Sequence, residues 1–219
     1  PFYIQPDTTT PSIVVTIDGG DILDGEYISS EPVIHIELTD ESLVPITDPN
    51  SVMIYLNDEL IPSDTSIITY QFSTTNPKVV VDFTPTFADG EYLMKVLWRD
   101  AEGNIVDSSG VEKFFLVSNE TKILQVYNYP NPTSGETNFT FKLTQIPEEI
   151  RIKIFTIAGR LVKELKYTSS DLKFDFNKLY WDGKDEDGDI LGNGVYLYKI
   201  IMKDGSKSEE VTQKLAIVK

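Results

Sequence analysis

The chain has 219 residues, enough for one large domain or two of ordinary size, and 40% of them are hydrophobic, which argues against general disorder. It contains no cysteine, which excludes disulfides, thiol nucleophiles and thiolate metal sites. The net charge of −16 falls entirely in residues 1–118, with 20 acidic and 4 basic side chains, whereas residues 119–219 hold 15 of each. This step in charge predicts a domain boundary, and the acidic first part argues against nucleic acid as a partner.

The N-terminal segment carries no recognisable targeting sequence. No apolar run anywhere approaches the roughly 18 residues that a membrane-spanning helix needs. Because the sequence begins at Pro1, without Met and without an apolar leader, we expect it to be a fragment or a processed product. The segment PFYIQPDTTTP, residues 1–11, is rich in Pro and Thr and predicts a linker.

The first part of the chain predicts strands rather than helices. Short runs rich in β-branched and aromatic residues are bounded by Gly, Pro, Asn and Asp, and DESLVPITDPN at 40–50 predicts a loop. The only histidine, His35, lies in the alternating run VIHIEL and is predicted to face solvent from a strand rather than to act in catalysis. The predicted strands are 12–17, 32–38, 51–57, 66–72, 78–83, 91–100 and 111–117.

The second part repeats this spacing after a polar segment, VSNETK at 117–122, which predicts a hinge. About seven strands in each part are typical of a β-sandwich. The predicted strands are 122–129, 136–143, 150–156, 161–167, 176–181, 194–203 and 209–219.

One phrase occurs almost twice, as DGEYLMKVLWRD at 89–100 and as GNGVYLYKIIMKDG at 192–205. In both copies a Gly ends a turn and an alternating strand follows. We interpret each copy as the penultimate strand of its own sandwich, joined by a turn in RDAEGN or KDGSK to a final strand. The face predicted to be buried consists of Tyr92, Met94, Val96 and Trp98 in the first copy and of Tyr196, Tyr198, Ile200 and Met202 in the second.

The acidic segment WDGKDEDGDILGNG, 181–194, is a candidate metal site. Asp185, Asp187 and Gly188 match part of the calcium-loop pattern D-x-[DN]-x-[DN]-G, and Asp189 adds a further carboxylate. The first and twelfth ligand positions fall on glycines, so we predict a long hairpin connection and no cofactor, with Ca²⁺ binding as the alternative. A second acidic cluster is a similar candidate and consists of Asp18, Asp21, Asp24 and Glu26.

Motifs of known catalytic sites are missing from the sequence. There is no G-x-S-x-G elbow, no P-loop and no dinucleotide fingerprint, and no feature places two carboxylates across a cleft. We therefore predict that this chain is not an enzyme. Aromatic residues make up 11% of the chain. Their strand spacing favours core positions, and an exposed sugar-stacking surface is the alternative.

Four short motifs follow one another in the second part: NYPNPTSGETNFTFKL at 128–143, IRIKIFTIAGRLVKEL at 150–165, WDGKDEDGDILGNGVYLYKI at 181–200 and KLAIVK at 214–219. Together they resemble the C-terminal sorting domain of proteins exported by the type IX secretion system of Bacteroidota and relatives. The resemblance covers about residues 119–219. The W-D-G-x-D-x-x-G piece is also similar to the Ig-like domain of flagellar hook-capping (FlgD-like) proteins.

The resemblance implies that the folded domain is read by the export machinery, an outer-membrane translocon and a sortase. It also implies export through the periplasm to the outer cell surface or the medium. Pro130 and Pro132 fix φ and remove backbone donors, which predicts an extended, unpaired entry segment. Gly159 and Arg160 predict a hairpin turn. The residues implied to carry the signal are Tyr129, Pro130, Asn131, Pro132, Gly159, Arg160, Leu161, Val162, Gly192, Gly194, Val195, Tyr196, Lys214 and Leu215.

The first part resembles the Ig-like module that precedes the sorting domain in large surface proteins such as gingipain-like cysteine peptidases. We therefore predict an all-β chain of two tandem Ig-like antiparallel β-sandwiches of about seven strands each. Residues 1–118 are expected to form an acidic spacer or adaptor, and residues 119–219 a sorting domain at the end of a larger exported bacterial protein. One alternative is a filament or matrix subunit that self-associates through the edge strand QKLAIVK. Another is a carbohydrate-binding or adhesion module.

Overall fold

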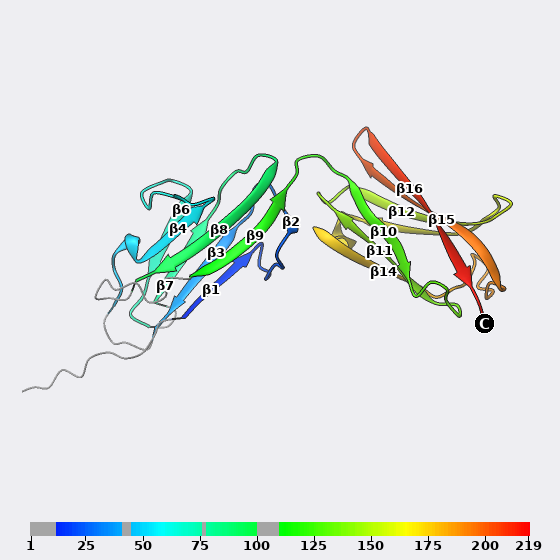
Figure 1. Ribbon diagram of the computed structural model, residues 1–219, viewed down its shortest axis with the longest axis horizontal. Coiled ribbons are helices and arrows are strands. Elements are labelled where there is room, and N and C mark those ends of the chain that lie inside the picture. Colours follow the sequence, from blue (N-terminus) through cyan, green and yellow to red (C-terminus); the bar gives the residue numbers. More distant parts are fainter. Residues whose placement is uncertain (1–11, 41–44, 76–77, 100–109) are drawn as a thin grey trace, which may run out of the picture. The chain divides into compact units, whose positions relative to one another are not determined.

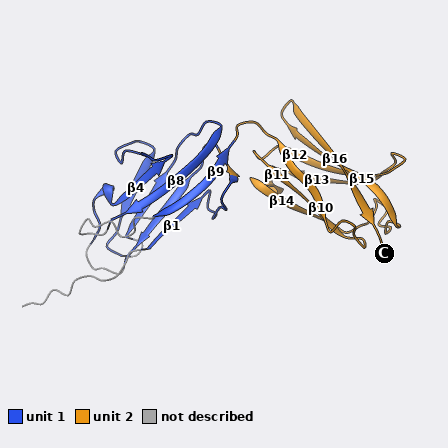
Figure 2. Cartoon of the chain, in the orientation of Figure 1, with its two compact units in different colours: residues 1–26, 30–117 blue, residues 27–29, 118–219 orange. Residues whose placement is uncertain are grey.

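A computed structural model describes residues 12–40, 45–75, 78–99 and 110–219. The chain divides into two compact units, residues 1–26 with 30–117 and residues 27–29 with 118–219 (Figure 2). Apart from two single-turn 3₁₀ helices, the regular structure in the described ranges consists of strands, so the all-β prediction is confirmed. No helix among the described residues is long and apolar enough to cross a membrane. The expected linker at 1–11 lies outside the described residues.

The first unit contains two sheets (Figure 1). Every strand pair of this unit whose register is defined is antiparallel. The 3₁₀ helix η1, Pro49–Ser51, is capped at its N-terminus by Asp48, whose side chain accepts a hydrogen bond from the N–H of Asn50. One sheet has the order β1 (Ser12–Ile17), β3 (Ile34–Thr39), β7 (Val79–Phe83) and β6 (Ile68–Phe72). The other has the order β2 (Glu26–Ile28), β9 (Val111–Val117), β8 (Gly90–Trp98), β4 (Val52–Leu56) and β5 (Glu59–Leu60), although residues 27 and 28 of β2 are grouped with the second unit.

The second unit also contains two sheets, and its strand pairs are antiparallel. The 3₁₀ helix η2, Ser169–Asp171, leads from one sheet to the other. The three-stranded sheet has the order β10 (Ile123–Tyr129), β11 (Thr137–Leu143) and β14 (Asp175–Trp181). The four-stranded sheet has the order β13 (Leu161–Thr168), β12 (Glu149–Thr156), β15 (Gly194–Asp204) and β16 (Lys207–Ile217).

The core of the second unit follows from period-two alternation in the strands. On β12, Ile150, Ile152 and Ile154 are buried while the residues between them are half-buried. Rings from the two sheets meet at Phe139 and Tyr198, whose centroids lie 4.7 Å apart. Aromatic pairs of this kind add stabilisation beyond the area that they bury, so this contact joins the two sheets of the sandwich.

The two units share a strand order, which explains the repeated phrase. The orders β1-β3-β7 and β9-β8-β4 in the first unit correspond to β10-β11-β14 and β16-β15-β12 in the second. The copies of the phrase form β8 and β15, and each pairs with the last strand of its unit, as predicted. The KDGSK turn is also confirmed, because Asp204 pairs with Lys207 around Gly205 at φ +57°. Most of RDAEGN lies outside the described residues.

The acidic segment is not the long hairpin that its composition predicts. It connects β14, in the three-stranded sheet, to β15, in the four-stranded sheet, and therefore crosses between sheets. A small antiparallel bridge between Lys184 and Ile190 folds the segment back on itself instead. Asp and Gly are favourable both in hairpins and in crossing loops, so composition alone does not distinguish the two connections.

Candidate functional site

The side-chain amide of Asn131 makes the hydrogen bonds to β16 that a neighbouring strand backbone would normally make. It is flanked by Pro130 and Pro132, which lack an N–H. Its Nδ2 donates to the carbonyl of Lys214 at 2.9 Å, and its Oδ1 accepts from the N–H of Ala216 at 3.0 Å. These are the two bonds that a residue of a parallel neighbouring strand makes to the residues on either side of its partner. The amide thus pairs with β16 where the proline-containing backbone cannot.

Thr133 continues this pairing with its own backbone. Its N–H donates to the carbonyl of Ala216 at 2.9 Å, and its carbonyl accepts from Val218 at 2.8 Å, in a parallel bridge to Ile217. The prediction that this segment is unpaired is therefore wrong, because a side chain substitutes for the missing donors. The end of β16 is covered on its outer edge by residues 131–133.

A buried hydrogen-bond network holds the YPNP segment from the core side. Asn128 donates to the carbonyl of Pro130 at 3.2 Å and to Thr137 Oγ1 at 3.1 Å. Thr137 in turn donates to Pro130 at 2.8 Å, and Asn131 donates to Asn128 Oδ1 at 3.0 Å. Asn128 and Thr137 are buried, so breaking the network would leave polar groups without partners.

The GNGVY motif lies against the same end of β16. In the β15–β16 ladder Gly194 pairs with Ile217 and Tyr196 with Leu215. Asn193 Oδ1 accepts from the N–H of Lys219 at 2.9 Å. Residues from three motifs, separated by many positions in sequence, are therefore brought together at one end of the second unit.

The fourth motif, GRLV at 159–162, is connected to the other three by hydrogen bonds to the acidic segment. Gly159, at φ +86°, lies in the turn between β12 and β13, where Thr156 N–H donates to the carbonyl of Arg160 at 2.9 Å. This confirms the predicted hairpin. The carbonyl of Val162 then accepts from the N–H of Glu186 at 3.1 Å. The acidic segment thus adds hydrogen bonds to the outer edge of β13.

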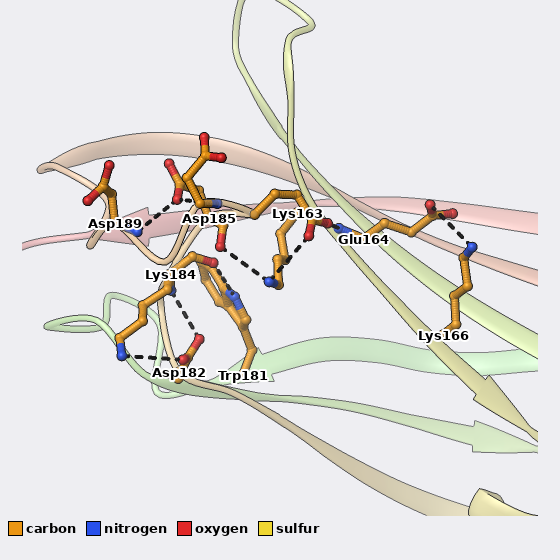
Figure 3. Close-up of polar contacts among 10 residues, drawn as sticks. Lys163, Glu164, Lys166, Trp181, Asp182, Lys184, Asp185 and Asp189 are labelled. Carbon is orange, nitrogen blue, oxygen red and sulfur yellow. Dashed lines mark hydrogen bonds and ion pairs between the residues drawn. The ribbon is translucent and has the colours of Figure 1, made fainter.

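Charged and polar contacts fix the acidic segment against β13 (Figure 3). Glu186 Oε1 accepts from the N–H of Glu164 at 2.8 Å, and this bond, together with the nearby Lys163, holds the pKa of Glu186 below its usual range. Lys163 Nζ also donates to the carbonyl of Asp185 at 3.2 Å, and Trp181 Nε1 donates to Lys184 at 3.0 Å. The acidic segment is therefore held in place by hydrogen bonds from its backbone to Lys163 of β13 and to Trp181 of β14.

The carboxylates of this loop serve its turn geometry. Asp185 Oδ1 accepts from the N–H groups of Asp187 at 3.1 Å and Asp189 at 2.9 Å. Gly183, at φ +77°, allows a close approach, because a Cβ there would lie 2.4 Å from the carbonyl oxygen of Gly135. Across the described ranges, no group of three or more His, Cys, Asp or Glu side chains is arranged to hold a metal ion.

The acidic cluster in the first unit is also divided among structural contacts. Asp18 Oδ1 accepts from the N–H of Val33 at 2.9 Å, and Asp24 Oδ1 accepts from Phe114 at 3.4 Å. Asp21 forms an ion pair with Lys113, which lowers the pKa of the Asp21 carboxyl. These carboxylates point to different partners rather than to one centre.

The motif residues fall into two groups by exposure. Two are buried, Val162 and Leu215, and these contribute to the core. Four further residues whose hydrogen bonds hold the motifs in place are not among the residues that the resemblance implies: Asn128, Thr133, Thr137 and Asn193. The one sequence signal for them is that they are polar residues close to the prolines or glycines of the motifs. The exposed or half-buried motif residues are Tyr129, Pro130, Asn131, Pro132, Gly159, Arg160, Leu161, Gly192, Gly194, Val195, Tyr196 and Lys214.

Comparison with solved structures finds several proteins of low sequence identity. The dimeric latent PorU of Porphyromonas gingivalis is 21% identical over 97% of this chain and 20% of that one, with a TM-score of 0.41. PorZ of the same organism, a surface component of its type-IX secretion system, is 14% identical over 94% and 23%, with a TM-score of 0.32. The fibronectin(III)-like modules of Clostridium thermocellum CbhA are 18% identical over 93% and 94%, with a TM-score of 0.33.

The chain spans about one fifth of the length of the PorU structure. No curated protein sequence matches it. Residues 127–181 match the model of a family described as the secretion system C-terminal sorting domain. The matched segment runs from β10 through β14 and contains the YPNP and GRLV motifs. The resemblance of the second unit to the secretion-system C-terminal sorting domain is thereby confirmed over residues 127–181.

Proposed function

We propose that residues 119–219 are the signal that directs a larger exported bacterial protein to a type IX secretion system and to the cell surface. Residues 1–118 act as an acidic, non-catalytic Ig-like spacer. The observation that carries the proposal is the meeting of the YPNP, GNGVY and KLAIVK motifs at one end of the second unit, joined by Asn131 and Asn193. The family match over residues 127–181 supports it.

A folded signal of this kind differs from a linear one. Tyr129, Arg160 and Lys214 are exposed but belong to segments that are far apart along the chain. Only folding brings such side chains into a fixed arrangement that a receptor can read. The proposed partners are the outer-membrane translocon and the sortase, the final location is the outer cell surface or the medium, and the role requires no cofactor.

The test is export of a reporter from a bacterium that has this secretion system. We expect export when residues 119–219 are fused after the reporter and no export when residues 1–118 are fused instead. The matched control is the same fusions in a strain that lacks the outer-membrane translocon, where neither should leave the cell. Normal secretion of a parent protein from which residues 119–219 have been removed would overturn the proposal.

The hydrogen bonds of Asn131 and Thr133 to β16 disfavour the alternative, a filament that assembles through QKLAIVK. Asn131 and Thr133 already occupy the outer edge of the last β16 residues, so that edge has fewer free backbone groups for another chain. Pairing there would require the YPNP segment to leave its place.

A further inference from the structure

The outer face of the three-stranded sheet in the second unit carries a group of exposed aromatic rings. Tyr129, Asn138 and Tyr180 lie in one row across β10, β11 and β14. Tyr127, Thr140 and Lys178 lie in the next. Four aromatic side chains on this face are exposed: Tyr127 by 51%, Tyr129 by 73%, Phe176 by 44% and Tyr180 by 56%. We call these four, with Lys178, the aromatic face.

A β-bulge in β10 turns two of these rings outward. The register shifts between Leu124 and Tyr127, and Gln125 lies at φ +51°. Because side chains alternate along a strand, the extra residue moves Tyr127 and Tyr129 to the outer face while Val126 packs on the core. A regular strand continuing from Leu124 would bury Tyr127. Bulges that aim side chains in this way are frequent at functional sites.

Hydrogen bonds hold the aromatic face in place. Tyr180 Oη donates to Glu136 Oε2 at 2.8 Å, which fixes the Tyr180 ring at the β14 end of its row. Thr140 Oγ1 donates to the carbonyl of Tyr127 at 3.0 Å, next to the bulge. A preorganised set of rings binds a ligand without the entropic cost of ordering each one.

The face carries charges of both signs, since Glu136 accepts from Tyr180 Oη at one end and two lysines lie along the strands. Lys178 lies between Phe176 and Tyr180 along β14, and in the described part of the chain no carboxylate lies within ion-pair distance of it. The other lysine of the face, Lys142, is already paired with Asp175 at 2.9 Å. Among the described residues, Lys178 is therefore the lysine of this face that has no ion-pair partner, and it lies between two exposed aromatic rings.

The corresponding face of the first unit lacks these features, although the strand order is the same. Its rows across β1, β3 and β7 are Thr16, His35 and Asp82, and Val14, Glu37 and Val80. The fold thus permits a polar face without aromatic rings at these positions. The aromatic face is a property of the second unit's sequence and not a requirement of the sandwich.

We propose that the aromatic face binds a polysaccharide that carries spaced acidic groups. Aromatic rings accommodate the apolar faces of pyranose rings, and Lys178 matches a carboxylate between them. Tyr129 and Tyr180 are two strand spacings apart, about 10 Å, which suits an extended chain of sugars rather than one ring. A hollow of about 310 Å³ lined by Lys163, Leu165, Tyr180, Trp181 and Asp182 borders Tyr180 and offers further polar contacts.

A regular polyanion such as single-stranded DNA fits this face less well. It also uses aromatic stacking, but it carries one phosphate per nucleotide and depends on a groove of several cations. In the described ranges, Lys178 is the lysine of the aromatic face without an ion-pair partner. Acidic groups separated by neutral sugars match that spacing of charge better.

The experiment measures binding of the full 219-residue chain to hyaluronan, in which uronic acids alternate with neutral sugars. We expect measurable binding that weakens with added salt. Tyr127→Ala and Tyr180→Ala should each weaken it by about tenfold if each ring stacks on a sugar. Lys178→Met should weaken it and remove its salt dependence.

Matched controls keep the result interpretable. Lys203→Met removes an exposed lysine from the opposite sheet, and Phe72→Ala removes an exposed ring from the first unit. Both should bind as the original chain does, and unchanged thermal unfolding of all variants shows that the fold is kept. Absence of hyaluronan binding, equal binding by the Tyr180→Ala variant, equal or tighter binding to neutral dextran, or tighter binding to oligo(dT) would each overturn the proposal.

Discussion

Asn131 Oδ1 accepts a hydrogen bond from the backbone N–H of Ala216, which lies 85 positions later in the chain. The same amide donates to Lys214, so both its oxygen and its nitrogen bond to the backbone of the last strand. A proline-flanked segment lacks backbone donors, and a strand edge beside it would otherwise bond to water or to another chain. One side chain thus joins the first of the four motifs to the last.

Replacing Asn131 tests this connection directly. We expect Asn131→Ala to lower the free energy of unfolding of the second unit by about 1.5–4 kcal/mol, because the three side-chain hydrogen bonds to Lys214, Ala216 and Asn128 are lost. Asn131→Asp should cost more, since a carboxylate would then face the Lys214 carbonyl oxygen. The measurement is denaturant unfolding followed at Trp181 in a Trp98→Phe background, which leaves one tryptophan.

Hydrogen exchange provides the internal control for that change. In Asn131→Ala the amide of Ala216 should lose protection, whereas the amide of Val218, bonded to Thr133, should lose less. Unchanged exchange at Ala216 would show that the side-chain amide is not the group that covers it.

How far sequence could predict this molecule depends on the range of the interactions. The sequence pattern predicts the ends of each described strand of five or more residues to within about two residues, because alternation is a local signal. The short strands β2 and β5 were missed, since two or three residues carry no period. Composition predicts a hairpin for the acidic segment, because Asp and Gly residues indicate a turn but not the sheet to which the next strand belongs.

The candidate site shows the same limit more clearly. The motif residues could be taken from the family resemblance, but their convergence could not. Nothing local to Asn131 indicates that its amide bonds to Lys214, and the bulge at Gln125 has no Gly to mark it. Both depend on tertiary pairing, which a single sequence read along the chain does not reveal.

Gly183 and Gly188 form a matched pair for a steric prediction. Both have positive φ, but a Cβ at Gly183 would overlap the carbonyl of Gly135, whereas one at Gly188 would meet no atom within 4 Å. Gly188→Ala should cost about 1–2 kcal/mol for the left-handed backbone alone. Gly183→Ala should cost about 1–3 kcal/mol more, because the two loop segments must separate. Equal unfolding midpoints for the two variants would contradict the close approach.

His35 makes the first unit's stability depend on pH. Its Nδ1 lies 2.6 Å from Asp82 and its Nε2 3.0 Å from Glu37, and these two partners raise the pKa of His35 above 6.5. Since the pKa is higher in the folded chain, the stabilisation is complete below the unfolded pKa and is lost as pH rises through the folded value. The charges are partly exposed, so the effect should be small.

The single histidine allows a direct measurement by NMR titration of its ring protons. We expect a pKa above 6.5 in the original chain and a smaller one in Asp82→Asn. In His35→Gln the difference in unfolding midpoint between about pH 5 and about pH 9 should shrink. A His35 pKa at or below 6.5 would rule out the raised value.

Lys214 and Leu215, adjacent in one motif, separate stability from sorting. Leu215 is buried in the core, so Leu215→Ala should lower the free energy of unfolding of the second unit by about 2–5 kcal/mol. Lys214 is exposed, and Lys214→Ala should change it by no more than about 0.5 kcal/mol, because the bond from Asn131 goes to the Lys214 backbone. If the side chain of Lys214 is read by the export machinery, a reporter carrying Lys214→Ala should fold normally and be exported poorly. Lys203→Ala, an exposed lysine on β15 outside the motifs, is the control and should be exported normally. Normal export of the Lys214→Ala reporter would assign the motif's role to Leu215 and the fold that it supports.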